Sequence, residues 1–140
     1  MRRGRLFAAA SMSLLAVTGA STIGATLSYT CVVKRVYDLS DTGELETSVW
    51  EKQMRGSAFS VSRVNGEIIG EVVPTLTAVR TRVVNPGTSK NSFKATAEFI
   101  SDNAGSQIQL IEIQEFMEGE SKPFVAASMG GAGIVTGVCR

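Results

Sequence analysis

The chain has 140 residues, 44% of them hydrophobic, with 14 basic and 13 acidic side chains and a formal net charge of +1. This length suits one domain, and the near balance of charge does not indicate a nucleic-acid partner. The sequence contains no histidine, which excludes histidine-based catalytic triads and histidine-ligated zinc.

The N-terminus has the three-part layout of a secretory signal peptide. A cationic start at residues 1–5 precedes an uncharged apolar run at residues 6–17 and small residues at 18–25. We expect residues 1–20 to be removed by cleavage after Ala20, with cleavage as late as Ala25 as the alternative. The protein would then be periplasmic or secreted.

Cleavage would leave residues 27–140 as a single β-domain without stable membrane insertion. It would remove three arginines, leaving 11 basic and 13 acidic residues and a net charge of −2. An uncleaved anchor is the other interpretation, because residues 6–27 carry no charge and are long enough to span a bilayer.

Two cysteines, Cys31 and Cys139, lie near the two ends of this domain. In an oxidising compartment an even pair predicts one disulfide, and only one pairing exists. A closed loop of about 100 residues stabilises a fold by roughly 4 to 5 kcal/mol in the chain-entropy model. We therefore expect the last strand beside the first. Two free redox-active thiols are the alternative, although no C-x-x-C pairing supports them.

Alternating apolar and polar residues from Leu27 to Val33 predict the first strand. The next segment, residues 38–49, has oxygen-bearing side chains spaced like the start of a calcium-binding loop, but Val49 stands where that loop needs a glutamate. A turn that closes a hairpin explains the same residues, so we predict no metal site. Residues 48–56 lack alternation and are predicted as a helical turn or an irregular cap.

Asn65-Gly66 is a strong signal for a two-residue hairpin turn. This turn would pair Phe59 with Val72 and Val61 with Gly70. The prediction is therefore a hairpin whose apolar side chains share one face.

A second hairpin is predicted with its centre at Thr88. It would pair Val83 with Phe93 and would place Arg82 across from Lys94.

The remaining segments also predict strands. Residues 107–117 are β-rich, and a change of phase at Leu110-Ile111 suggests a bulge. Residues 123–129 and 133–139 form the last predicted hairpin. Seven or eight strands with hairpin spacing predict an all-β fold, either a small antiparallel β-barrel or a sandwich closed by the disulfide. A bond between first and last strands favours a closed barrel.

The second hairpin suggests a binding patch. Its register places Arg80, Arg82 and Lys94 together on the outer face of an acidic mature protein. Such a patch would suit an anionic partner. Solvated charges partly balanced by Glu98 are the alternative interpretation.

No catalytic site is indicated. Pairs such as Ser89-Lys90 lie in predicted turns, and Glu112 and Glu115 would point to opposite faces of a strand. We therefore predict that the protein is not an enzyme and has no cofactor.

Tyr29-Thr30-Cys31 and the terminal cysteine resemble the chain ends of bacterial periplasmic inhibitors of c-type lysozyme. That family's inhibitory loop combines Ser-Gly-x-x-Tyr with Trp-x-Lys-Gly, whereas Trp50 is followed here by Glu51-Lys52-Gln53. No site residue is carried over from the resemblance.

Two functions are expected for an exported, bacterial-type domain of this kind. The first is a non-catalytic module, including inhibitors, that binds a protein partner in the cell envelope or extracellular space through loops. The second is a carrier of a small apolar ligand inside the barrel. A packed interior would favour the module and an open cup the carrier.

Overall fold

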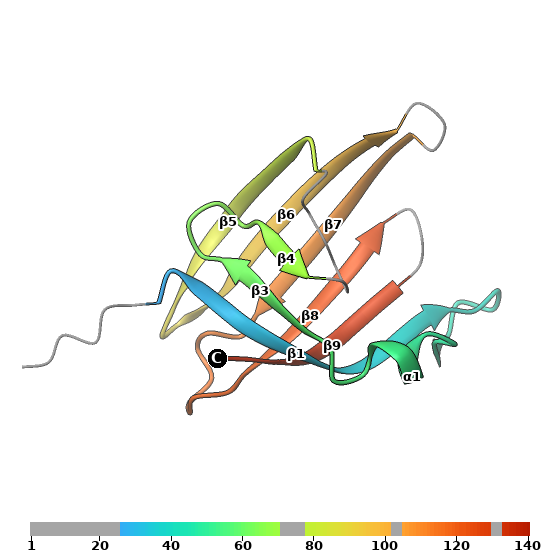
Figure 1. The fold of residues 1–140 in the computed structure, drawn as a ribbon, viewed down its shortest axis with the longest axis horizontal. Helices are drawn as coiled ribbons and strands as arrows, with labels where there is room; N and C mark the ends of the chain where they lie inside the picture. The colour runs from blue at the N-terminus through green and yellow to red at the C-terminus, as the bar shows by residue number, and fades with distance from the viewer. Residues whose placement is uncertain (1–25, 71–77, 102–104, 130–132) are drawn as a thin grey trace, which may run out of the picture.

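The computed structural model describes residues 26–70, 78–101, 105–129 and 133–140 (Figure 1). The predicted signal peptide lies outside the described residues. No helix within the described part is long and apolar enough to cross a membrane.

The described residues form nine strands and one short helix. These elements are β1 (Ser28–Leu39), β2 (Leu45–Thr47), α1 (Glu51–Met54), β3 (Ala58–Ser62), β4 (Ile68–Gly70), β5 (Arg80–Thr88), β6 (Asn91–Ser101), β7 (Gly105–Ile113), β8 (Lys122–Met129) and β9 (Gly133–Cys139).

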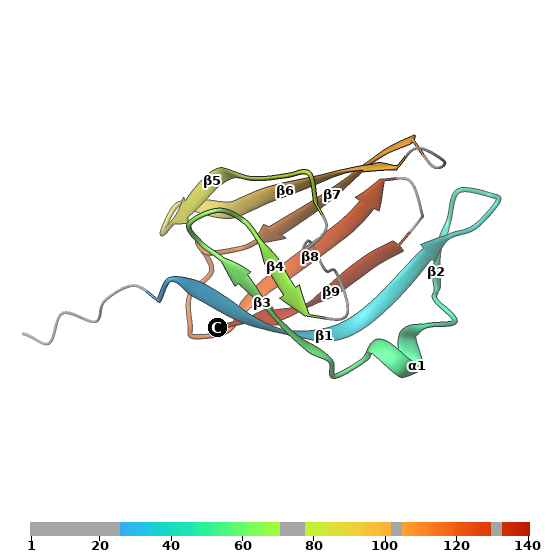
Figure 2. The same ribbon diagram turned by 45° about the horizontal axis from the view of Figure 1, so that its top comes forward.

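All strands belong to one antiparallel sheet in the order β4-β3-β1-β9-β8-β7-β6-β5, and β2 pairs with the far end of β1. The sheet curls into a half-barrel, seen from two directions in Figures 1 and 2. The all-β prediction is therefore confirmed, and the sheet is barrel-like, although it forms a half-barrel rather than the closed barrel that the sequence favoured. The edge strands β4 and β5 do not pair within the described ranges. The strand count exceeds the predicted seven or eight because β2, a strand of three residues, lies in the segment that was predicted only as a turn.

The predicted disulfide joins Cys31 of β1 to Cys139 of β9, with Cα atoms 3.9 Å apart. The two cysteines face each other in the β1–β9 ladder. Thr30 and Arg140 exchange two backbone hydrogen bonds of 2.9 Å, so the next pair inward, Cys31 and Cys139, is the close, non-hydrogen-bonded kind. The first and last strands are therefore neighbours, as expected.

The first predicted hairpin forms with a different register. Phe59 pairs with Gly70 and Val61 with Ile68, two residues from the expected partners. A two-residue turn at Asn65-Gly66 needs positive φ at both positions, but only Gly66 has it, with φ of 77°. A longer loop forms instead, closed by the Ser62 N–H, which donates to the Glu67 carbonyl at 2.8 Å.

The second hairpin also forms with a register that differs from the predicted one, by two or three residues. Its turn is Ser89-Lys90, because Thr88 pairs with Asn91, and Val83 pairs with Ala95. Asn85-Pro86-Gly87, expected in the turn, belongs to β5, and a bulge follows Val83.

The predicted bulge at Leu110-Ile111 is absent from the continuous registers of β7 with β6 and β8. Ile111 faces the core, whereas Leu110 is an exposed apolar residue on the convex face. A real bulge lies in β1 between Val33 and Arg35. Residues three apart on a regular strand point to opposite faces. The bulge supplies one extra residue, so that both Val33 and Val36 are buried.

The core fills one half of the concave face. Tyr29 packs against Phe93, and Phe59 packs edge-on against Phe124, with ring centroids 5.2 Å apart in both pairs. Gly137 of β9 leaves the space that Phe124 occupies, because a Cβ there would come within 2.7 Å of the Phe124 ring and 2.0 Å of the Val32 carbonyl oxygen.

Candidate functional site

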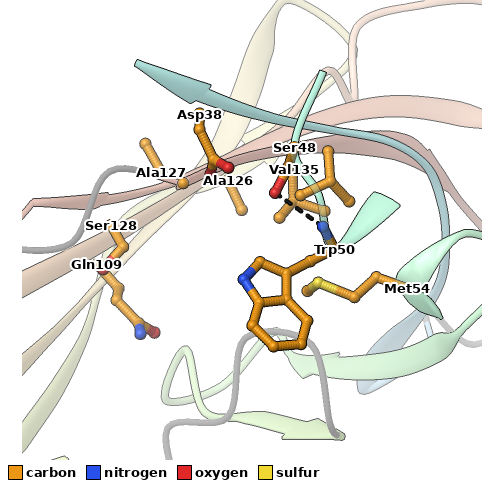
Figure 3. Close-up of a pocket in the computed structure, with 11 residues that line it drawn as sticks. Asp38, Ser48, Trp50, Met54, Gln109, Ala126, Ala127, Ser128 and Val135 are labelled. Carbon is orange, nitrogen blue, oxygen red and sulfur yellow. Dashed lines mark hydrogen bonds between the residues drawn. The ribbon is translucent and has the colours of Figure 1, made fainter. Parts of the chain in front are cut away.

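A partly enclosed cavity lies on the concave face, at the end of the half-barrel that carries β2 and α1 (Figure 3). We call it the rim pocket. Its volume is about 240 Å³. It is lined by Val36, Asp38, Ser48, Trp50, Met54, Gln109, Ala126, Ala127, Ser128, Gly133 and Val135.

Side-chain size along the strands explains why the cavity lies there. The register aligns inward-facing residues in rows that cross β6, β7, β8 and β9. The first row is Phe93, Ile113, Phe124 and Gly137; the second is Ala95, Ile111, Ala126 and Val135; the third is Ala97, Gln109, Ser128 and Gly133. Phe93, Ile113 and Phe124 fill the first row. In the third row the small residues Ala97, Ser128 and Gly133 leave part of the concave face unfilled. The pocket is therefore the unfilled end of the core.

The opposite wall comes from α1 and the residue before it. In Figure 3, Trp50 and Met54 lie on one side of the pocket, and Gln109 and Ser128 lie on the other. Trp50 is 58% exposed, and its backbone N–H donates to the Ser48 hydroxyl at 3.2 Å. Met54 packs against the buried core. Trp50 therefore presents an indole ring at the mouth, while Met54 anchors the wall below it.

Glu51 holds α1 on the sheet. Its carboxylate is almost fully buried and accepts hydrogen bonds from Arg55, from Arg35 at 3.1 Å and from the Val36 N–H at 3.4 Å. The hydrogen bond from Arg55 contributes most to lowering the pKa of Glu51, and those favourable contacts outweigh the opposing effect of desolvation. Glu51 is thus a structural anion that positions Trp50 and Met54.

Two polar side chains that line the pocket are Gln109 and Asp38. The Gln109 Oε1 atom is buried and has no hydrogen-bond partner among the described residues. An unsatisfied buried acceptor costs free energy. Asp38 lines the pocket because of the bulge in β1. Before the bulge the odd-numbered residues such as Val33 face inward, and after it the even-numbered residues Val36 and Asp38 do. A second carboxylate, that of Glu46, belongs to the residue directly opposite Asp38 in β2.

The calcium-like spacing at residues 38–49 forms a hairpin, as the turn interpretation predicted. Asp38 and Glu46 belong to paired strands, and the Ser40 hydroxyl accepts a hydrogen bond from the Glu44 N–H at 3.0 Å. Searching the described residues finds no group of three or more ligand-type side chains that could hold a metal ion.

The predicted patch of Arg80, Arg82 and Lys94 lies on the convex face, away from the rim pocket. Arg80 is opposite Glu98 and 4.0 Å from its carboxylate, and Lys94 is 3.4 Å from Glu112.

Arg82 is opposite Thr96 rather than Lys94, because the hairpin has the shifted register. The structure does not gather the three cations as closely as predicted. Their role in binding a partner stays a prediction.

The carboxylates considered for glycoside chemistry are separated. Glu112 pairs with Lys94 on the convex face. Glu115 accepts hydrogen bonds from the Tyr29 hydroxyl at 3.0 Å and from Arg63 at 3.2 Å. Burial raises the pKa of Tyr29, and its hydrogen bond to Glu115 raises it further. This cluster closes the packed end of the half-barrel.

Sequence reasoning missed the rim pocket. The sequence pattern places Trp50 only in an irregular segment and Gln109 only in a strand. A comparison with protein-family models found no match, and searches of curated proteins and of solved structures also found none.

Proposed function

We propose that this protein is a non-catalytic binding module of the periplasm or extracellular space, and that the rim pocket receives an apolar side-chain stem from a partner protein. The observation that carries the proposal is a cavity with apolar walls and polar groups beside a tryptophan that is more than half exposed. Tryptophan is enriched among the residues that dominate binding energy at protein interfaces.

The surroundings of the pocket support a protein partner. Val49 and Trp50, which follow the β1–β2 hairpin, are each more than half exposed. Leu39 and Leu45 are also more than half exposed, but they face each other on the side of the hairpin away from Asp38. Clustered exposed apolar side chains commonly mark a contact surface. The disulfide is consistent with an oxidising, extracytoplasmic environment, where such a partner would be met.

A carrier of a small apolar ligand is the second candidate, favoured by the position of the cavity on the concave face of a half-barrel. Its volume of about 240 Å³ lies below the roughly 300 to 1,000 Å³ of typical pockets for drug-sized ligands. That size suits one side chain better than a whole ligand.

Trp50 is the only tryptophan in the chain, so its fluorescence reports directly on the pocket. The test selects peptides from a random display library on the oxidised domain, residues 26–140, and then measures their binding by the change in Trp50 emission. Ser128→Met should fill the pocket and abolish binding of the selected peptides. Thr136→Met, on the opposite face of the neighbouring strand, is the matched control and should leave binding unchanged.

Selected peptides that bind the Ser128→Met variant as tightly as the unmodified domain would contradict the proposal. The carrier would be established instead by two results together. The domain would bind diphenylhexatriene, a neutral apolar dye, saturably and in a manner that Ser128→Met blocks, and it would bind no peptides.

A further inference from the structure

The hairpin at the mouth of the rim pocket is strongly acidic. Residues 38–49 contain four carboxylates, Asp38, Asp41, Glu44 and Glu46, and no lysine or arginine. The hairpin therefore presents net negative charge beside the rim pocket.

Two of these carboxylates oppose each other on one face. Asp38 and Glu46 are direct cross-strand partners in the β1–β2 ladder, an arrangement in which like charges are destabilising. Neither forms an ion pair with any residue that the structure describes, whereas Glu51, Glu98, Glu112 and Glu115 all do. A cation bound between the pocket and the hairpin would relieve this repulsion.

The neighbouring cations of the chain do not fill that role. Arg35 and Arg55 are engaged with Glu51. Lys52 lies on a separate surface hollow, lined by Thr47–Val49, Glu51 and Arg55. No lysine or arginine is among the described residues that line the rim pocket.

We infer that the occupant of the rim pocket is a lysine or arginine side chain of the partner protein, an inference that rests on the proposed function. Val36, Met54 and Val135 provide apolar walls for the aliphatic stem. The Trp50 ring attracts a cation over its face, and Asp38 supplies the opposite charge. The pocket therefore calls for an apolar stem, a cation for the ring and a positive charge for Asp38. A lysine or arginine meets all three requirements with one side chain.

The test uses two display libraries on the oxidised domain, one with all residue types and one whose codons exclude lysine and arginine. We expect pocket-dependent binders, defined by loss of binding in Ser128→Met, from the complete library only, with a shared basic residue. Asp38→Asn and Glu46→Gln should each weaken these binders about threefold to tenfold. Asp41→Asn, which neutralises a carboxylate at the exposed tip of the same hairpin, should change affinity less than twofold, an estimate of about the size expected for a screened rim charge.

The outcomes separate the two proposals. Pocket-dependent binders from both libraries, insensitive to Asp38→Asn and Glu46→Gln, would overturn the cationic occupant and leave the binding module standing. Binders that all ignore Ser128→Met would overturn both. Free hexylamine that displaces the peptides and binds as tightly as they do would assign the pocket to small amines and overturn the inference of a protein side chain.

Discussion

Removal of the disulfide by the double substitution Cys31→Ala and Cys139→Ala should strongly destabilise the domain without changing its fold. The bridge closes a loop of sequence separation 108. For a loop of about that length the chain-entropy model gives roughly 16 cal/mol/K, or about 4.8 kcal/mol at about 25 °C. Measured effects commonly fall below the model, so we expect a loss of roughly 3 to 5 kcal/mol.

The fold should survive because β9 is held by strands on both sides. It pairs with β1 and with β8, and the reciprocal hydrogen bonds between Thr30 and Arg140 do not depend on sulfur. Small domains have total stabilities of about 5 to 15 kcal/mol, so the variant should stay folded but with little reserve.

Urea unfolding followed by circular dichroism and Trp50 fluorescence measures the effect. The slope of free energy against urea should also increase, because the unfolded chain without the cross-link exposes more surface. The unmodified protein in dithiothreitol is the control and should match the variant. A loss below about 1 kcal/mol would refute the view that the bridge acts by limiting the entropy of the unfolded chain.

Three further predictions follow from individual residues. Gly137→Ala should cost about 3 kcal/mol or more of unfolding free energy, because its Cβ would overlap the Val32 carbonyl. Gly119→Ala has no atom within 4 Å but has a φ of 92°, so it tests backbone strain without overlap and should cost only about 1 to 2 kcal/mol. Equal losses for the two variants would contradict the argument. Glu51 has a lowered pKa in the folded state, so its stabilising contribution is present above the unfolded value of 4.5 and is lost as pH falls through the lower folded pKa. The Trp50 emission of the native protein should therefore change below about pH 4.5. If a Glu51→Gln variant shows the same acid transition, the transition belongs to another group. The intact mass of the exported protein should lack the first 20 to 25 residues, and a full-length mass in the membrane fraction would establish the uncleaved anchor.

The sequence by itself determined the strand content and the disulfide. Alternating residues report which face of a strand is buried, and this information is local, so β1, β3 and β6 to β9 were predictable. Two cysteines allow one pairing, so Cys31 and Cys139 also required no tertiary information. The outward Leu110 misled the same reasoning, because periodicity cannot distinguish a bulge from an apolar residue on the convex face.

Strand register depended on backbone geometry that composition does not report. Asn65 lacks the positive φ that the predicted turn requires, and Asn85-Pro86-Gly87 extends a strand rather than turning it. Each of these differences moved the paired residues by two or three positions. The predicted grouping of Arg80, Arg82 and Lys94 depended on that register and changed with it.

The rim pocket was decided only by the tertiary structure. Gln109, Ser128 and Gly133 are unremarkable along the chain, and they form an open row only because three strands align them. Asp38 enters the same site because one extra residue in β1 reverses the phase of the strand. Tertiary structure likewise decides whether the sheet closes or remains a half-barrel. Closure requires β4 and β5 to pair, and pairing of edge strands depends on where they lie after the whole sheet has curled rather than on either strand's own sequence.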